Sequence, residues 1–209
     1  LRIRELAGRT LGIIGLGQLG SAVATIGRAF GMRVLAARRT DAHLEEDDRV
    51  PLEELLRQSD VLSLHCPLTA ENRGLIGAGE LEMMKPDALL INTARGGLVD
   101  SAALANALRA GRIGGAAVDV LPQEPPVDGD PLLDVDLDNL IVTPHVAWAA
   151  VEARQRAVDQ VAEGPPGTLG TTVVKVAGVV HAPSIGPAAR RFRSTASPIP
   201  RSGSSPTAT

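Results

Sequence analysis

The stretch Gly15-Leu16-Gly17-Gln18-Leu19-Gly20 decides the fold of this chain. It follows an apolar run over residues 10–14 that predicts a strand, and it opens a helical pattern of apolar residues over 19–30. A G-x-G-x-x-G pattern between a strand and a helix is typical of a dinucleotide-binding unit, whereas the pattern without that context is a weak signal. The alternative interpretation is a glycine-rich turn with a purely structural role.

Each glycine of this turn has its own task in the dinucleotide interpretation. Gly15 permits the tight turn, Gly17 lets a pyrophosphate approach the backbone, and Gly20 lets the helix pack closely on the strand. Free N–H groups at the start of the helix, at Gln18 and Leu19, then face the phosphates. The sequence therefore predicts a dinucleotide cofactor.

Strand-like apolar runs alternate with helical patterns outward from this turn, as far as residue 163. The expected strands are 10–14, 33–37, 61–64, 88–92, 115–120 and 140–143, and the expected helices are 19–30, 52–58, 80–84, 101–110 and 152–163. This alternation predicts an α/β fold with a doubly wound parallel sheet, the Rossmann fold, whose ligands bind at the carboxyl ends of the strands.

Composition supports this class and excludes others. Hydrophobic residues make up 44% of the chain but aromatic ones only 1%, so the core must be aliphatic, which suits a buried parallel sheet. A net charge of −3 gives no field that would attract nucleic acid or an anionic membrane surface, and neither partner is expected. Cys66 is the only cysteine, so no intrachain disulfide forms and a cytoplasmic location is expected.

The chain changes character after residue 163. Gly164-Pro165-Pro166 is expected to end the last helix, and residues 164–209 are rich in Pro, Gly, Ser and Thr. This segment contains five Lys and Arg residues but no Asp or Glu, and only 171–180 resembles a strand. We expect a basic and largely disordered C-terminal tail.

The residues after the second expected strand bear on cofactor choice. An acidic residue usually binds the adenosine ribose there, but this chain has Arg38-Arg39-Thr40. Two guanidinium groups and a hydroxyl pair well with a 2′-phosphate, which favours NADP over NAD. Two alternatives stay open: Asp41 reaches back to the ribose, or both arginines lie on a solvated edge.

Three further segments carry reactive groups at expected strand ends, and with two flanking motifs they resemble the D-isomer-specific 2-hydroxyacid dehydrogenase family. The resemblance covers about residues 5–163, and several ordered motifs in one chain are more specific than any single motif. Its motifs are Glu5-Leu6-Ala7-Gly8-Arg9-Thr10-Leu11-Gly12, His65-Cys66-Pro67-Leu68-Thr69, Asn92-Thr93-Ala94-Arg95-Gly96-Gly97, Asp119-Val120-Leu121-Pro122-Gln123-Glu124-Pro125-Pro126 and Thr143-Pro144-His145-Val146-Ala147-Trp148.

The resemblance implies three catalytic residues. Arg95 would bind the substrate carboxylate through two parallel hydrogen bonds and so hold the reactive carbon in one pose. His145 would be the acid and base that exchanges a proton with the 2-oxo or 2-hydroxy oxygen, and Glu124 would hold its ring and favour the charged form. The alternatives are a surface arginine, a helix-capping histidine and an exposed turn glutamate.

The same resemblance implies cofactor contacts near the nicotinamide ring. Asp119 would face the carboxamide, Pro67 would help position the ring, and Thr93 and Cys66 lie in the motifs beside it. Cys66 has no apparent partner for a nucleophile or metal. No metal site is expected, because the other histidines lack metal-ligand spacing with acidic or cysteine neighbours: they are His43, His65 and His181.

Family members place their substrate between two domains. By this resemblance residues 1–9 would be the end of an interdomain linker, 10–163 the NAD(P)-binding domain, and the N-terminal substrate domain would be absent. The whole protein would be a homodimer that transfers hydride between NADP(H) or NAD(H) and a small 2-oxo or D-2-hydroxy acid. Residues 144–149 resemble most the glycerate dehydrogenase and glyoxylate/hydroxypyruvate reductase branch. The alternative is a non-catalytic fragment or a corepressor-like nucleotide-sensing module.

Overall fold

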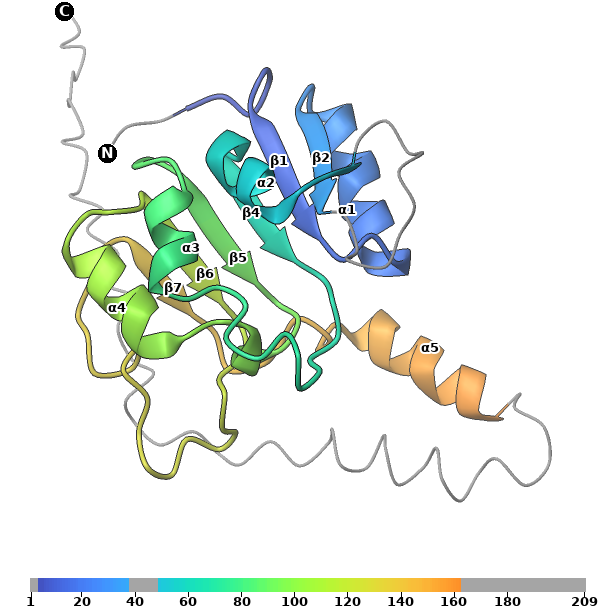
Figure 1. Ribbon diagram of the computed structural model, residues 1–209. Coiled ribbons are helices and arrows are strands. Elements are labelled where there is room, and N and C mark those ends of the chain that lie inside the picture. The colour runs from blue at the N-terminus through green and yellow to red at the C-terminus, as the bar shows by residue number, and fades with distance from the viewer. Residues whose placement is uncertain (1–3, 38–48, 163–209) are drawn as a thin grey trace, which may run out of the picture.

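The computed structural model describes residues 4–37 and 49–162, and these form a seven-stranded parallel sheet with helices on both faces (Figure 1). The strand order is β3-β2-β1-β4-β5-β6-β7. The strands are β1 (Thr10–Ile14), β2 (Arg33–Ala37), β3 (Arg49–Val50), β4 (Val61–Leu64), β5 (Leu89–Asn92), β6 (Gly115–Val118) and β7 (Leu140–Val142). The helices are α1 (Gln18–Ala29), α2 (Leu52–Gln58), α3 (Ala78–Met83), α4 (Ser101–Arg109) and α5 (Val151–Ala162), with a 3-10 turn, η1, at Gly96–Leu98. The predicted doubly wound α/β fold is confirmed.

Differences from the expected elements are small and have local causes. The sequence predicted six strands, and the structure adds β3, which is too short to show a period in the sequence and pairs only with the end of β2. β6 ends two residues before the expected end at 120, because the backbone bends at Asp119. α3 begins at Ala78 rather than at residue 80, because the Glu80 side chain accepts a hydrogen bond from the backbone N–H of Gly77. The predicted tail, 164–209, lies outside the described residues.

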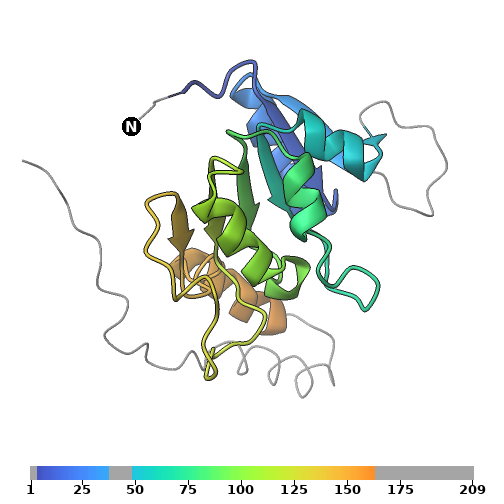
Figure 2. The same cartoon turned by 60° about the vertical axis from the view of Figure 1, so that its left-hand side comes forward.

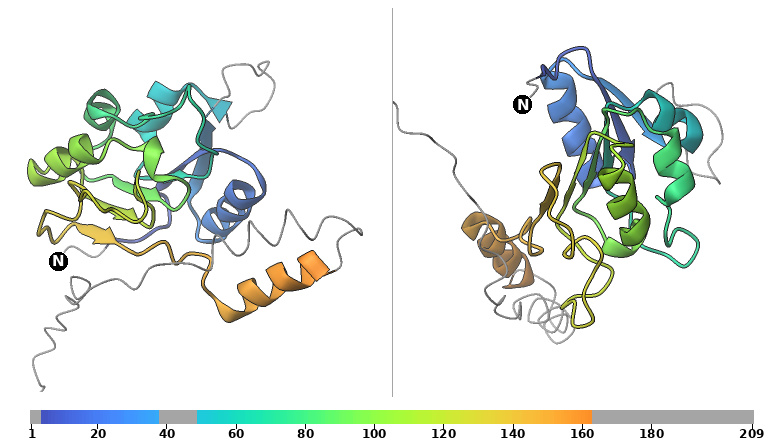
Figure 3. Two further views of the ribbon diagram at one scale, coloured as in Figure 1. Left: turned by 90° about the horizontal axis from the view of Figure 1, so that it is seen from below. Right: turned by 90° about the vertical axis from the view of Figure 1, so that its left-hand side faces the viewer.

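The helices cover the sheet unequally. Figures 2 and 3 show α2, α3 and α4 on one side of the sheet and α1 on the other. The larger core cluster joins α2, α3 and α4 to alternate positions of the central strands, such as Leu62, Leu64 and Leu90, all with 0% exposure. α1 packs instead through a small-residue face, Gly20, Ala24 and Gly27. A Cβ at Gly27 would lie 2.6 Å from a methyl carbon of Leu11, so glycine there sets how closely α1 approaches β1.

The strand order fixes where ligands can bind. β1 pairs with β2 on one side and with β4 on the other, so the chain reverses direction across the sheet at β1. In open α/β sheets the crevice outside the carboxyl ends of the strands at such a switch point is the usual ligand site. α5 lies beyond this edge and points away from the sheet (Figures 1 and 3). Within the described ranges no helix is both long and apolar enough to cross a membrane.

Candidate active site

The glycine turn after β1 has the geometry that its sequence suggests. Gly15 has φ +98, and a Cβ there would lie 2.5 Å from the backbone nitrogen of Cys66, so only glycine fits. A Cβ at Gly20 would lie 2.1 Å from the carbonyl oxygen of Gly15. A Cβ at Gly17, in contrast, would meet no atom within 4 Å. The turn is therefore tight on its inner side and open at Gly17.

The start of α1 supplies hydrogen-bond donors to this open side. Gly17 is the N-cap residue, and it has no side chain that could accept a hydrogen bond from the first turn. The N–H groups of Gln18 and Leu19 precede the first intrahelical donor, Ser21, whose N–H bonds the carbonyl of Gly17 at 2.8 Å. Free donors at a helix N-terminus attract an anionic group, so the turn fits a pyrophosphate.

The residues predicted to select the cofactor are Arg38, Arg39 and Thr40, with Asp41 as the alternative. All four lie outside the described residues. The strand that precedes them in the sequence, β2, ends at Ala37 beside the end of β1.

The loop after β4 places the backbone of Cys66 against Gly15 of the glycine turn, and Pro67 follows in the same loop. Asn72, which the sequence analysis did not single out, closes this loop: its Nδ2 donates to the carbonyl of Pro67 at 2.8 Å, and its Oδ1 accepts from the N–H of Thr69 at 2.7 Å. Burial raises the pKa of the Cys66 thiol, which keeps it protonated. Cys66 thus supplies packing and backbone to the turn and has no sign of a reactive thiolate.

The histidine before this loop has a local partner. His65 lies half-buried with its Nε2 2.9 Å from the Ser63 hydroxyl, and burial lowers the pKa of its ring. Among the described residues, no group of three or more His, Cys, Asp or Glu side chains is arranged to hold a metal ion. His43 and His181 lie outside the described residues.

The loop after β5 presents Arg95 to solvent. Thr93 and Arg95 are exposed, and the Arg95 guanidinium donates only to the carbonyl of Ala94, at 2.6 Å, among the hydrogen bonds of the described residues. Gly96 packs directly on the next loop, because a Cβ there would lie 2.0 Å from the carbonyl carbon of Leu121. The Arg95 loop and the loop that carries Glu124 are therefore in contact.

Glu124 and His145 form a hydrogen-bonded pair. The Oε2 of Glu124 lies 2.6 Å from the Nδ1 of His145, and its Oε1 accepts from the N–H of Leu121 at 2.8 Å. The histidine has φ 52, a conformation that non-glycine residues rarely adopt and that often marks a functional site. Because Nδ1 is used by Glu124, Nε2 is the ring nitrogen left for a substrate.

Asp119 holds the turn on which His145 lies. Its side chain accepts from the Thr143 hydroxyl at 2.5 Å and from the N–H groups of Val146 and Ala147 at 2.9 Å each. Burial would raise the pKa of this carboxyl, but these hydrogen bonds and the nearby His145 ring outweigh it and hold the pKa below its usual value. Asp119 is thus ionised, and its predicted contact with a nicotinamide carboxamide stays a prediction.

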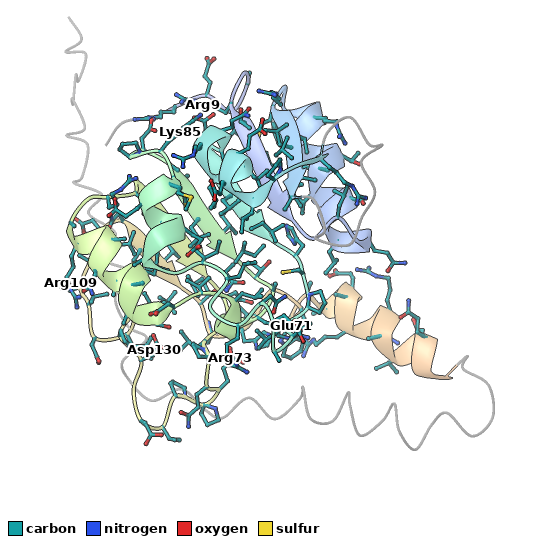
Figure 4. All side chains as sticks on the ribbon, in the orientation of Figure 1. Arg9, Glu71, Arg73, Lys85, Arg109 and Asp130 are labelled. Carbon is teal, nitrogen blue, oxygen red and sulfur yellow. The ribbon has the colours of Figure 1, made fainter. Side chains whose placement is uncertain are left out.

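The two ends of the parallel strands differ in chemistry. Figure 4 shows Arg9 and Lys85 together at the end where the strands begin, and Glu71 and Arg73 at the carboxyl end. At the amino end Asp60 accepts from Lys85 at 3.0 Å and from Arg9 at 3.4 Å, an ion-pair cluster remote from the glycine turn. The predicted site residues that lie in the described ranges are at the carboxyl end.

Comparisons with known proteins agree with this geometry. A family model described as "D-isomer specific 2-hydroxyacid dehydrogenase, NAD binding domain" matches residues 1–147. Glycerate dehydrogenase from Methylorubrum extorquens is 56% identical over 161 residues, which are 77% of this chain and 50% of that protein. Glyoxylate reductase from Aeropyrum pernix is 45% identical over 185 residues, 82% of this chain and 55% of that protein.

A solved structure supports the same relationship. An acyclic imino acid reductase in complex with NADPH and D-Arg superposes with a TM-score of 0.70 at 36% identity, over 81% of this chain and 53% of that one. The chain spans about half the length of the curated relatives it matches.

Proposed function

The chain belongs to the D-isomer specific 2-hydroxyacid dehydrogenase family as its NAD binding domain, and on this premise we propose that the whole protein interconverts a 2-oxo acid and a D-2-hydroxy acid. One observation carries the proposal: the Glu124 carboxylate holds Nδ1 of His145 at 2.6 Å, at the carboxyl end of the strands, where Arg95 and the glycine turn also lie. A positioned acid and base, a carboxylate-binding cation and a dinucleotide turn are the groups that this reaction needs.

Each residue has a defined task in the proposed reduction. The guanidinium of Arg95 binds the carboxylate of the 2-oxo acid and fixes the pose of the neighbouring carbonyl. The imidazolium of His145 donates its Nε2 proton to the carbonyl oxygen, and Glu124 holds the ring through Nδ1. The nicotinamide of the bound cofactor supplies the hydride. In the reverse direction neutral His145 accepts the hydroxyl proton.

The substrate and cofactor are finer parts of the proposal. Glyoxylate or hydroxypyruvate is the proposed 2-oxo acid, supported by the names of the relatives and by the resemblance of residues 144–149. NADPH is the proposed preferred cofactor, supported by Arg38 and Arg39 after β2 and by the NADPH complex of a structural neighbour. From the sequence resemblance we further propose that the whole protein is a homodimer. Because Cys66 is the only cysteine of the chain, we propose a cytoplasmic location.

The test is a rate measurement on the whole protein that contains this chain. We expect glyoxylate or hydroxypyruvate to cause oxidation of NADPH, followed by loss of its absorbance, and His145→Ala to abolish most of the rate. We expect Arg38→Ala to weaken NADPH binding and to leave NADH binding nearly unchanged. Tight dinucleotide binding without oxidation by any small 2-oxo acid would contradict the proposal and favour a nucleotide-sensing module.

A further inference from the structure

We infer that Asn92 is the positioning residue that fixes the backbone on which Arg95 is presented to the substrate carboxylate. The inference deepens the proposed function and rests on it, because it concerns the same site. Asn92 is the last residue of β5, and its side chain is 0% exposed although it is polar.

The amide of Asn92 bonds both sides of the turn that leads to Arg95. Its Oδ1 accepts from the N–H of Ala94 at 3.1 Å, and its Nδ2 donates to the carbonyl of Arg95 at 3.0 Å. One planar group therefore holds the peptide unit that precedes Ala94 and the peptide unit that follows Arg95. Both ends of the segment Ala94-Arg95 are held in this way, which limits the direction in which the Cα of Arg95 points its side chain.

The backbone of Asn92 is itself held by the sheet. Asn92 pairs with Val118 in the sheet, and its carbonyl accepts from the N–H of Asp119 at 2.9 Å. The turn is also held from its other side, where Gly96 lies against the backbone of Leu121. The backbone of the Arg95 loop is thus supported from two sides, and Arg95 itself is exposed.

Packing alone does not explain why a polar asparagine occupies this buried position. Asn92 lies on the same face of β5 as Leu90, which is fully buried in the larger core cluster. An apolar side chain there would add buried apolar surface, whereas a buried amide contributes only when its donors and acceptors are paired. Aspartate would lack the donor to Arg95, and glutamine is one methylene longer.

A merely structural role and a positioning role make different predictions. If Asn92 only stabilises the fold, its loss lowers the fraction of folded protein and leaves the Michaelis constants of the remaining enzyme unchanged. If Asn92 positions Arg95, its loss raises the Michaelis constant for the 2-oxo acid and lowers turnover, and the affinity for the dinucleotide stays the same.

The experiment compares Asn92→Ala with Ser59→Ala in the whole protein. Ser59 is also 0% exposed and donates one hydrogen bond, to the carbonyl of Leu55 at 2.6 Å. It lies before β4, at the amino end of the strands, whereas the site lies at their carboxyl end. We expect Asn92→Ala to lower kcat/KM for the 2-oxo acid roughly tenfold to a hundredfold, because small displacements of a positioning group cost this much. Ser59→Ala should lose stability without this change.

Asn92→Ser provides the conservative rescue. A serine hydroxyl can still accept from the N–H two residues on, at Ala94, but it is too short to reach the Arg95 carbonyl as well. We expect its KM for the 2-oxo acid to lie between those of wild type and Asn92→Ala. An unchanged KM in Asn92→Ala, or the same change in Ser59→Ala, would overturn the inference.

A second readout separates failure of this inference from failure of the proposed function. Amide hydrogen exchange of the 209-residue chain reports the turn directly: the N–H of Ala94 should exchange faster in Asn92→Ala and at the wild-type rate in Ser59→Ala. If the whole wild-type protein reduces no 2-oxo acid, the proposed function fails. If exchange at Ala94 is unaffected, the positioning role of Asn92 fails, whatever the activity.

Discussion

Gly17 and Gly20 lie three residues apart in one turn, yet the structure gives them opposite sensitivities. A Cβ at Gly20 would lie 2.1 Å from the Gly15 carbonyl oxygen, whereas one at Gly17 meets no protein atom within 4 Å. We expect Gly20→Ala to destabilise the 209-residue chain by about 1–3 kcal/mol through overpacking. Gly17→Ala should leave the stability unchanged and weaken dinucleotide binding, because the methyl group occupies the space for the pyrophosphate.

The measurement pairs urea unfolding with calorimetric titration of NADPH for both variants. If Gly17→Ala binds NADPH as tightly as wild type, the pyrophosphate does not lie against Gly17. Gly20→Ala with unchanged stability would show that α1 can move away from β1 at no cost.

Glu124 and His145 allow a prediction for the whole protein across pH. Only the imidazolium can donate a proton, so the rate of reduction should fall as pH rises, and the rate of oxidation should show the opposite limb. Glu124→Gln removes the carboxylate that holds the ring at Nδ1, so the rate of reduction should fall while some activity remains. His145→Ala should lose about 10²–10⁴ in rate. A rate of reduction in Glu124→Gln equal to that of wild type would rule out a role for this carboxylate in holding the ring.

The sequence predicted candidate site residues more readily than the side chains that hold their loops. Arg95, Glu124 and His145 were proposed from their chemistry and motifs, and the structure pairs Glu124 with His145, while their catalytic roles stay predictions. Asn72 and Asn92 were not found, because an amide acts through the turn it closes, and the partners of a turn are visible only once the backbone is placed. The contacts of Asp119 to the His145 turn were not foreseen, and its assigned contact with the cofactor stays a prediction.

At the level of elements, Asp60 links neighbouring segments at the amino end of the strands, opposite the site. It follows α2 directly before β4, accepts from the N–H of Thr10 at 2.8 Å, and pairs with Lys85 and Arg9. Burial would raise the pKa of Asp60, but these hydrogen bonds and charges outweigh it and lower the pKa below the ordinary 3.8. A carboxyl with a lowered folded pKa stabilises the fold above its unfolded pKa, and this stability is lost as pH falls through the folded value.

Asp60→Asn should therefore be less stable than wild type at pH 7, by about 2 kcal/mol, the size of a hydrogen bond to a charged group. The difference should shrink below about pH 4 as the wild-type carboxyl is protonated. Urea unfolding at a series of pH values checks this, and Glu53→Gln, in an exposed pair with Arg57, is the control that should change little. A difference independent of pH would mean that the charge of Asp60 contributes nothing.

The elements themselves could be predicted from the sequence almost completely, for a physical reason. Strands buried on both faces give continuous apolar runs such as 34–37 and 115–118, and amphipathic helices give a period near four, so both are local signals. β3 was not predicted because its two residues form a strand only through pairing with Ala36 and Ala37. Element ends depended on single hydrogen bonds, such as that of Glu80 with Gly77, which no periodicity contains.

At the scale of the whole molecule, one flank of α1 has no cover among the described residues. Leu19, Ile26 and Phe30 are 74%, 57% and 59% exposed, and they follow one another at helical spacing with Val23 between them. We expect Ile26→Glu to leave the stability within about 0.5 kcal/mol and to raise the solubility of the 209-residue chain, because exposed apolar patches promote association. Thr25→Glu on the opposite flank is the matched control. Equal solubility of the two variants would contradict this.

The exposure of the site leads to a last prediction about the 209-residue chain. Arg95 is exposed, and the side chains of His145 and Glu124 are 43% and 35% exposed, so the groups proposed to react face water. Hydride transfer needs a closed cleft from which water is excluded, and the chain spans only half the length of its relatives. The glycine turn, in contrast, is complete within the chain.

We therefore expect the purified 209-residue chain to bind NADPH but to reduce glyoxylate or hydroxypyruvate far more slowly than the whole protein. Calorimetric titration measures the first property and loss of NADPH absorbance measures the second, with Gly17→Ala as the control for binding. Turnover at ordinary enzyme rates, about 1–10³ s⁻¹, would show that the described edge of the sheet suffices to exclude water from the reacting atoms. Absence of NADPH binding would instead show that the turn needs contacts from beyond this chain, and that the cofactor site extends past the domain that its sequence defines.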